Sequence, residues 1–206
     1  MRPFWNANTH YHRVVLESLA SDVARVLDVG CGDGILAADL VDAGVTSVVA
    51  LDIDRPVLDR ARARHEGRTI EWVQGDFLTV ALQPESFDAV VSVAALHHMD
   101  AAQALVRCAQ LVRPGGIVVV VGLAAYAWSD IPLVAIAIVS RLTLGLVHGR
   151  WRHSAPTCWP PPLTYRDMKA LSARVLPGVR YRRHLLSRYS LVWRKPMPAG
   201  TKEQYA

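Results

Sequence analysis

Short runs rich in Val, Ile or Leu alternate with helical patterns along the first 122 residues, and this alternation constrains the fold more than any other feature. The runs lie at 25–29, 47–51, 70–74, 87–93 and 117–122. Their composition is that of buried strands, and the segments between them are long enough for crossover helices. Because strands joined by such helices run in parallel, we expect an α/β fold with a mostly parallel sheet.

Capping patterns mark the ends of the predicted helices. The N-terminal signals are Asp54 with Pro56, Asp100 with Gln103, and Thr164 with Asp167. Gly44 is placed to close the first crossover helix, and residues 113–116, Arg-Pro-Gly-Gly, to end a later helix before the strand at 117–122. The last two runs with strand composition, 179–186 and 189–194, lie close enough to form an antiparallel hairpin at the sheet edge.

A glycine-rich turn follows the first predicted strand. Residues 26–34 read Val-Leu-Asp-Val-Gly-Cys-Gly-Asp-Gly. Glycine permits a sharp turn and lets a ligand approach the backbone closely. A dinucleotide fingerprint would need its third glycine where Ile35 stands, and no Gly-Lys-Ser/Thr sequence follows, so a pyrophosphate ligand is disfavoured. A turn that serves only strand-to-helix packing is also consistent with this pattern.

Two acidic residues follow the next two predicted strands. Asp52 is placed to accept hydrogen bonds from ribose hydroxyls. Asp76 is placed to accept one from an adenine amino group, with Ile53 and Phe77 as an apolar slot for the ring. Each acid alone is equally consistent with a helix cap or a solvated loop residue. In series with the glycine turn, they favour an adenosine site.

These elements, in this order, resemble the class I S-adenosylmethionine-dependent methyltransferases, specifically the type 11 group of small-molecule methyltransferases. The resemblance covers residues 24–123 and rests on motifs at 27–34, 51–54, 74–77 and 111–116. It implies a Rossmann-like, seven-stranded, mostly parallel sheet with an antiparallel edge strand, in agreement with the predicted hairpin. It also implies S-adenosyl-L-methionine as methyl donor and S-adenosyl-L-homocysteine as product.

The resemblance further implies which residues hold the cofactor. The glycine turn borders the methionine part, Asp28 supports its ammonium group, Asp52 holds the ribose and Asp76 the adenine amine. In relatives the N-terminal segment folds over the cofactor, which makes Tyr11 an expected contact. The expected cofactor-binding set is Asp28, Gly30, Cys31, Gly32, Gly34, Asp52, Ile53, Gly75, Asp76, Phe77, Ser92 and Tyr11.

The segment after the fourth predicted strand contains Leu96, His97 and His98, at the place where the reactive methyl group should face the acceptor. A histidine there can remove a proton from a hydroxyl or an amine, and His98 is the first choice. A role in packing or in closing the cofactor site is equally open. Because a sulfonium methyl is already activated, alignment of the reacting atoms alone can supply much of the rate.

Two absences narrow the chemistry. The same loop lacks the Asn/Asp-Pro-Pro-aromatic sequence of many enzymes that methylate planar amino nitrogens, which disfavours adenine or glutamine as the acceptor. The histidine pairs at His10 and His12 and at His97 and His98 have no carboxylate at helical spacing, so no metal site is predicted.

Acceptor selection is expected outside the shared core. The apolar stretch 131–147 predicts a lid that excludes water and accepts an apolar or aromatic molecule, although a plain buried helix fits the same pattern. It is interrupted by Arg141 and is too short for a transmembrane span. The expected substrate-binding residues are Trp5, His12, Trp128, Trp151, His153 and Trp159.

We expect one domain over residues 1–206, a length that suits a single core. Its predicted parts are an N-terminal cap helix (1–23), the cofactor-binding core (24–123), a lid insertion after the fifth strand (124–163), a closing helix with the edge hairpin (164–196) and a flexible tail (197–206). Three cysteines without metal-type spacing and the lack of a secretory signal suit a cytoplasmic protein.

Charge divides the chain into two halves. Residues 1–100 have 8 Lys and Arg against 15 Asp and Glu, whereas the remainder has 15 against 3. The acidic half suits a cationic cofactor, and the basic half can meet an anionic partner.

The leading hypothesis is methyl transfer to a small, largely apolar acceptor, with oxygen preferred, by a monomer or homodimer without obligatory nucleic acid. The alternatives are RNA methylation, suggested by Arg180, Arg182, Arg183 and Arg188, and methylation at a membrane surface, suggested by the stretch 131–147 beside Arg150 and Arg152. A protein with this fold that binds the cofactor without methylating is also open.

Overall fold

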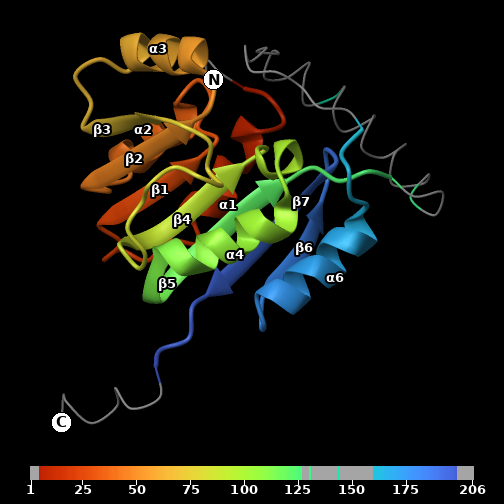
Figure 1. The fold of residues 1–206 in the computed structure, drawn as a ribbon. Helices are drawn as coiled ribbons and strands as arrows, with labels where there is room; N and C mark the ends of the chain where they lie inside the picture. The colour runs from red at the N-terminus through yellow and green to blue at the C-terminus, as the bar shows by residue number, and fades with distance from the viewer. Residues whose placement is uncertain (1–4, 127–129, 131–142, 144–159, 199–206) are drawn as a thin grey trace.

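A computed structural model describes residues 5–126, 130, 143 and 160–198 (Figure 1). The elements are η1 (Thr9–Tyr11), α1 (His12–Leu16), β1 (Arg25–Val29), α2 (Ile35–Asp42), β2 (Ser47–Asp52), α3 (Arg55–Arg64), β3 (Ile70–Gln74), β4 (Phe87–Val93), η2 (Leu96–His98), α4 (Ala101–Leu111), β5 (Val112–Gly122), α6 (Tyr165–Val175), β6 (Arg180–His184) and β7 (Arg188–Arg194). The predicted lid stretch 131–147 lies outside the described residues, apart from Thr143.

The strands form one seven-stranded sheet in the order β3-β2-β1-β4-β5-β7-β6. β1, β2, β3, β4 and β5 pair in parallel, because crossover connections join each of them to the next. β7 is antiparallel to β5 and β6 is antiparallel to β7, so the predicted edge hairpin is confirmed. The chain order reverses between β1 and β4, and open α/β sheets bind ligands beyond the carboxyl ends of the strands at such a point.

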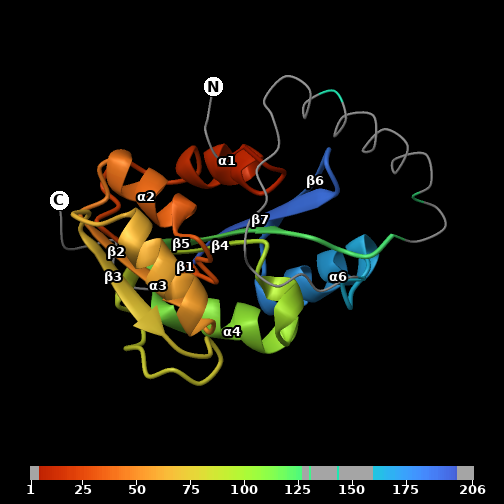
Figure 2. The same ribbon diagram turned by 90° about the horizontal axis from the view of Figure 1, so that it is seen from above.

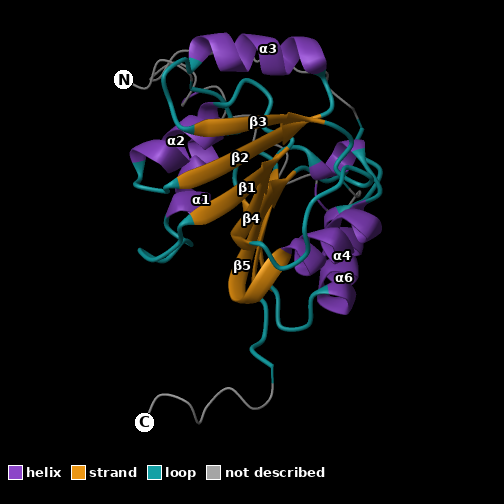
Figure 3. Cartoon of the chain, turned by 60° about the vertical axis from the view of Figure 1, so that its left-hand side comes forward, coloured by secondary structure: helices purple, strands orange, loops and turns teal. Residues whose placement is uncertain are grey.

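Helices cover both faces of the sheet. α1 and α2 lie on one side and α4 and α6 on the other (Figures 2 and 3). Alternate residues of β5 enter separate cores, since Val118 and Val120 pack with α4 and α6 whereas Val119 packs with α1, α2 and α3. The central strands are therefore apolar on both faces, which explains their nearly unbroken runs of Val, Ile and Leu.

The predicted caps hold the helix ends. The side chain of Asp54 accepts a hydrogen bond from the Val57 amide at the start of α3. Asp100 does the same for the Gln103 amide in α4. Thr164 and Asp167 form the full reciprocal capping box of α6, in which each side chain accepts a bond from the other residue's backbone amide.

Strand β5 begins five residues earlier than the sequence pattern predicts, at Val112 instead of Ile117. Val112 pairs with Phe87, and the register shifts before Ile117 pairs with Ala89. The amide of Gly115 also donates to the Lys195 carbonyl just beyond β7. Pairing on both sides thus draws the Arg-Pro-Gly-Gly segment, expected only to end a helix, into the sheet.

No helix in the described ranges is long and apolar enough to cross a membrane.

Candidate functional site

The glycine turn between β1 and α2 lies at the carboxyl end of the central strands. Gly30, Gly32 and Gly34 all have positive φ, at +68°, +52° and +72°. A Cβ on Gly30 would lie 2.2 Å from the Cβ of Ala95, so the turn packs directly against the loop after β4. A Cβ on Gly32 would meet nothing within 4 Å, which leaves its backbone open to a close approach. The first of these glycines serves packing, and the second leaves room for a ligand.

Asp28 is a buried carboxylate just before this turn. Its side chain is 1% exposed, and its Oδ2 atom has no hydrogen-bond partner among the described residues. Burial, with a smaller contribution from the charge of Asp52, raises the pKa of Asp28 from 3.8 to about 8. A buried anion without a partner is costly, and a cationic ligand group that donates hydrogen bonds would relieve that cost.

Asp52 closes the turn from the end of β2. Its Oδ2 atom accepts a hydrogen bond from the Gly32 amide at 2.8 Å, and its Oδ1 atom accepts one from the Asp54 amide at 3.0 Å. These bonds fix the carboxylate orientation and leave lone pairs for further donors. Next to it, the side chain of Ile53 is 64% exposed, although large apolar side chains are usually buried.

Asp76 and Phe77 follow β3 but take different environments. Asp76 is exposed, and its Oδ1 atom accepts a bond from the Leu78 amide. Phe77 is 3% exposed in the core below α4, with the Arg107 guanidinium 5.7 Å from its ring centre. Of the expected adenine slot, only Ile53 presents an exposed apolar side chain. Sequence alone does not reveal this, because the turn after Asp76 decides which way Phe77 points.

Other members of the expected cofactor set have structural partners. The Ser92 hydroxyl donates to the Val29 carbonyl at 2.9 Å and joins β4 to β1. A Cβ on Gly75 would lie 3.1 Å from a Val80 methyl group, so this residue packs closely with the following turn. Burial raises the pKa of the Cys31 thiol, which keeps it neutral beside the three nearby carboxylates.

The two histidines of η2 differ in burial. His97 is half-buried, and its Nδ1 atom is buried without a partner in the described part of the chain. Burial, then the charges of His98 and Arg188, lowers the pKa of His97 to about 4, so its ring is neutral at physiological pH. His98 is exposed, with its ring centre 4.1 Å from that of His97.

A strained residue lies just before the histidines and has no signal in the sequence. Ala94 has φ +58°, a conformation that is uncommon for residues other than glycine. Its amide donates to the Val121 carbonyl at 2.7 Å, which anchors the loop to β5. The positive φ of Ala94 turns the backbone at this point. Ala95 then packs against Gly30, and η2 begins at the next residue.

The expected N-terminal contacts bind other protein groups. The Tyr11 hydroxyl donates to the Leu185 carbonyl at 2.5 Å, in the turn between β6 and β7. The Nδ1 atom of His12 lies 2.8 Å from the Asp39 carboxylate of α2. Trp5 is 6% exposed. Tyr11 also packs in the same hydrophobic cluster as Cys31 of the glycine turn. Trp128, Trp151, His153 and Trp159 lie outside the described residues.

An adenosine-bearing cation fits the residues gathered at the ends of β1 and β2. Asp28 offers a buried carboxylate oxygen, Gly32 an open backbone, Asp52 a fixed carboxylate and Ile53 an exposed apolar surface. No group of three His, Cys, Asp or Glu side chains suited to a metal ion occurs in the ranges that the structure describes.

Known methyltransferases are similar to this chain in sequence. A methyltransferase-domain family model matches residues 27–120. The chain is 42% identical over 199 residues to an uncharacterized methyltransferase of Mycobacterium tuberculosis (strain ATCC 25618 / H37Rv), a match covering 94% of this chain and 98% of that protein. It is also 40% identical over 96 residues to a ubiquinone biosynthesis O-methyltransferase of Aliivibrio fischeri (strain MJ11), covering 45% of this chain and 41% of that protein.

The fold is similar to that of a solved S-adenosylmethionine-dependent methyltransferase from Mesorhizobium loti. The TM-score is 0.59 at 20% sequence identity, with 88% of this chain and 96% of that chain covered. Sequence and fold thus agree with the site geometry. The chain belongs to the class I S-adenosylmethionine-dependent methyltransferases, in the type 11 group, and S-adenosylmethionine is its cofactor.

Proposed function

We propose that this methyltransferase transfers the methyl group to a small, largely apolar or aromatic acceptor, with oxygen preferred as the accepting atom. The buried, unpartnered Asp28 oxygen beside the open glycine turn suits a cationic methyl donor and so carries the methyl-transfer part of the proposal. The name of the Aliivibrio fischeri relative, an O-methyltransferase, supports oxygen as the acceptor atom. The absence of the motif that marks planar-amine methylation supports the same choice.

The residues at the strand ends would divide the cofactor among them. Asp28 would accept hydrogen bonds from its ammonium group, and Asp52 would accept those of the ribose hydroxyls with its remaining lone pairs. Asp76 would accept from the adenine amine, and Ile53 would cover one face of the ring. When bound, the cofactor supplies an activated methyl group on a sulfonium, ready for in-line displacement.

We further propose that the two histidines of η2 face the acceptor in different roles. His98 is exposed and remains the first choice for taking a proton from the acceptor. His97 is held neutral by burial, so its ring can accept a hydrogen bond from an acceptor hydroxyl and orient it. A ring with a pKa of about 4 is a poor base. His97 would therefore align the acceptor hydroxyl and leave proton removal to His98.

Binding and turnover test the cofactor assignment directly. Calorimetry with S-adenosylhomocysteine should show binding that Asp52→Ala weakens by at least about tenfold, as expected from loss of two hydrogen bonds. Asp59→Ala is the matched control, because Asp59 is exposed on α3 and pairs only with Arg55 among the described residues. Unchanged affinity in Asp52→Ala would show that the ribose lies elsewhere.

The acceptor can be sought with labelled S-adenosylmethionine and a panel of phenols, hydroxy acids and amines. Transfer of label to a phenol or alcohol is the expected result, and His98→Asn should then lower turnover by about 10²-fold or more. His97→Asn should act mainly by raising KM. A near-normal turnover of the His98 variant removes the base role, and labelling only of amines overturns the preference for oxygen.

A second candidate function is RNA methylation, favoured by the basic second half of the chain, with 15 Lys and Arg against 3 Asp and Glu. RNA binding that weakens steeply with added salt would support it, and no binding at low salt would exclude it.

A further inference from the structure

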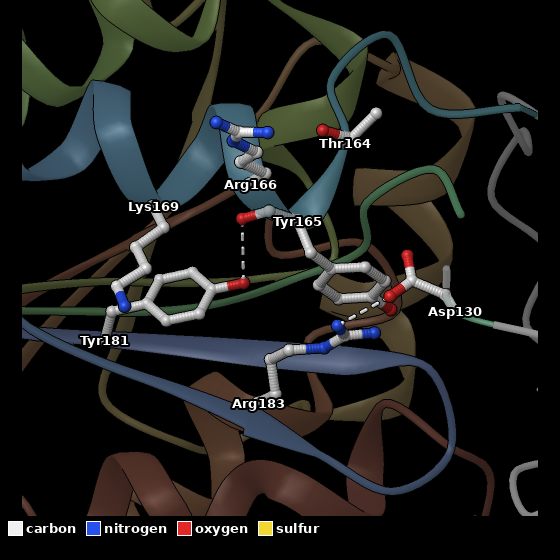
Figure 4. A pocket seen from close by; sticks show the side chains of 7 residues that line it. All are labelled: Asp130, Thr164, Tyr165, Arg166, Lys169, Tyr181 and Arg183. Atoms are coloured by element: carbon white, nitrogen blue, oxygen red, sulfur yellow. Dashed lines mark hydrogen bonds and ion pairs between the residues drawn. The ribbon is translucent and has the colours of Figure 1, made fainter. Parts of the chain in front are cut away.

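A cleft with a volume of about 530 Å³ opens between α6 and the edge strand β6 (Figure 4). Its walls carry Tyr165, Arg166 and Lys169 from the helix, Tyr181 and Arg183 from the strand, and Asp130. This volume lies within the range of small-molecule sites. The proposed cofactor residues lie at the ends of β1, β2 and β3, whereas β6 is the strand at the opposite edge of the sheet, so the cleft is a separate site.

Two side chains of the cleft are held in fixed positions. The Arg183 guanidinium lies 4.0 Å from the centre of the Tyr165 ring, and its Nη1 atom is 2.8 Å from an Asp130 carboxylate oxygen. The Tyr181 hydroxyl donates to the Tyr165 carbonyl at 3.2 Å. Figure 4 shows Lys169 extending from α6 toward β6, the strand that carries Tyr181 and Arg183, and all three residues line the cleft. The cleft therefore presents ordered flat surfaces next to a cation.

The charges around the cleft are strongly unbalanced. After residue 100 the chain has only three acidic residues, and the two that the structure describes are already engaged. Asp130 pairs with Arg183, and Asp167 is part of the capping box of α6. Within the described ranges, Arg166 and Lys169 have no carboxylate partner. The lining thus has three cations against one anion, and the surplus favours an anionic ligand.

We propose that this cleft binds a small anion with a flat apolar body, such as an aromatic carboxylate. The Lys169 ammonium contacts its carboxylate, and the ring packs against Tyr181. Arg166 adds positive charge at the rim of the cleft, because its guanidinium points away from Tyr181 in Figure 4. The inference stands independently of the identity of the methyl acceptor, because none of its residues belongs to the cofactor site.

Amide NMR titration of the full chain with benzoate and with inorganic phosphate tests the proposal. Benzoate should shift the amides of α6 and β6 saturably, with a Kd of about 1–10 mM, and it should bind more tightly than phosphate. Lys169→Gln should weaken benzoate binding about three- to fivefold, as for an exposed charge pair, and Arg166→Gln should weaken it by less than about twofold. Arg174→Gln is the matched control, since Arg174 is an exposed cation of the same helix that does not line the cleft.

Several results would overturn the proposal. Absent or unsaturable shifts at the cleft amides would show that no site exists there. An equal loss of benzoate affinity in the Lys169 and Arg174 variants would show that only the overall positive charge of the protein matters. If phosphate binds more tightly than benzoate, the aromatic ring of the ligand does not contribute to binding, and the proposal is wrong. Saturating S-adenosylhomocysteine should leave the benzoate titration unchanged. If S-adenosylhomocysteine abolishes the shifts, benzoate binds in the cofactor site instead.

Discussion

Replacing Asp28 by Asn should make the cofactor-free protein more stable at pH 8 and weaken its hold on the cofactor. The amide has nearly the shape of the carboxylate but carries no charge. In the wild-type protein the side chain is 1% exposed, and burial raises its pKa from 3.8 to about 8. The folded state therefore binds the Asp28 proton more tightly than the unfolded state, and ionisation of this group opposes folding.

The size of the effect follows from the two pKa values. A difference of about 4 pKa units corresponds to about 5 kcal/mol at 1.36 kcal/mol per unit. Because the folded pKa is the higher one, this stability is fully present below about pH 4, is lost as the pH rises toward 8, and changes little above 8. The Asn variant has no such loss, so its advantage should grow across this window to a few kcal/mol.

Urea unfolding at pH 5, 6.5 and 8 without cofactor measures the prediction. Asp59→Asn serves as the control, because this carboxylate is exposed on α3. Calorimetry should show the opposite effect on binding: S-adenosylhomocysteine affinity should fall about 10- to 100-fold in Asp28→Asn, since a hydrogen bond to a charged group is worth about 1.5–3 kcal/mol. Parallel stability curves for wild type and Asp28→Asn would refute the reasoning, as would a variant less stable at pH 8.

Substitutions at three further positions test the fold. Gly30→Ala should destabilise the protein by about 2–5 kcal/mol in thermal unfolding, because φ is +68° and the new Cβ meets Ala95 at 2.2 Å; a loss below 1 kcal/mol would contradict this packing. Thr164→Ala should cost about 1 kcal/mol by removing the capping box of α6, while Thr164→Ser should restore most of it. Tyr189→Phe should stabilise by about 1 kcal/mol, because the Tyr189 hydroxyl is buried without a described partner; destabilisation would indicate that the hydroxyl is satisfied.

Much of the core was predictable from the sequence because its signals are local. Residues 25–29 and 70–74 form strands with the predicted bounds, since apolar β-branched runs suit strands buried on both faces. Asp54 and Thr164 cap helices as expected, because capping depends on residues within one turn. The glycine turn was also predictable from the sequence, since its backbone needs residues that tolerate positive φ.

The tertiary structure decided the features that depend on distant partners. Phe77 was expected to face the cofactor but lies in the core, because packing below α4 buries its ring. Tyr11 bonds to the Leu185 carbonyl of the turn between β6 and β7, a contact between residues far apart in the chain. The length of β5 likewise depends on its pairing with β4 and β7.

The sequence by itself determined the class of fold and the methyl donor, since a strand, a glycine turn and two later acids are patterns that a chain carries locally. Only the tertiary structure showed that Asp28 is sealed from solvent, that His97 and His98 differ in burial, and that Tyr165 and Arg183 meet in one cleft. The physical reason is that burial, pKa shifts and clefts are properties of packing between elements, whereas turns and caps are set by neighbours along the chain.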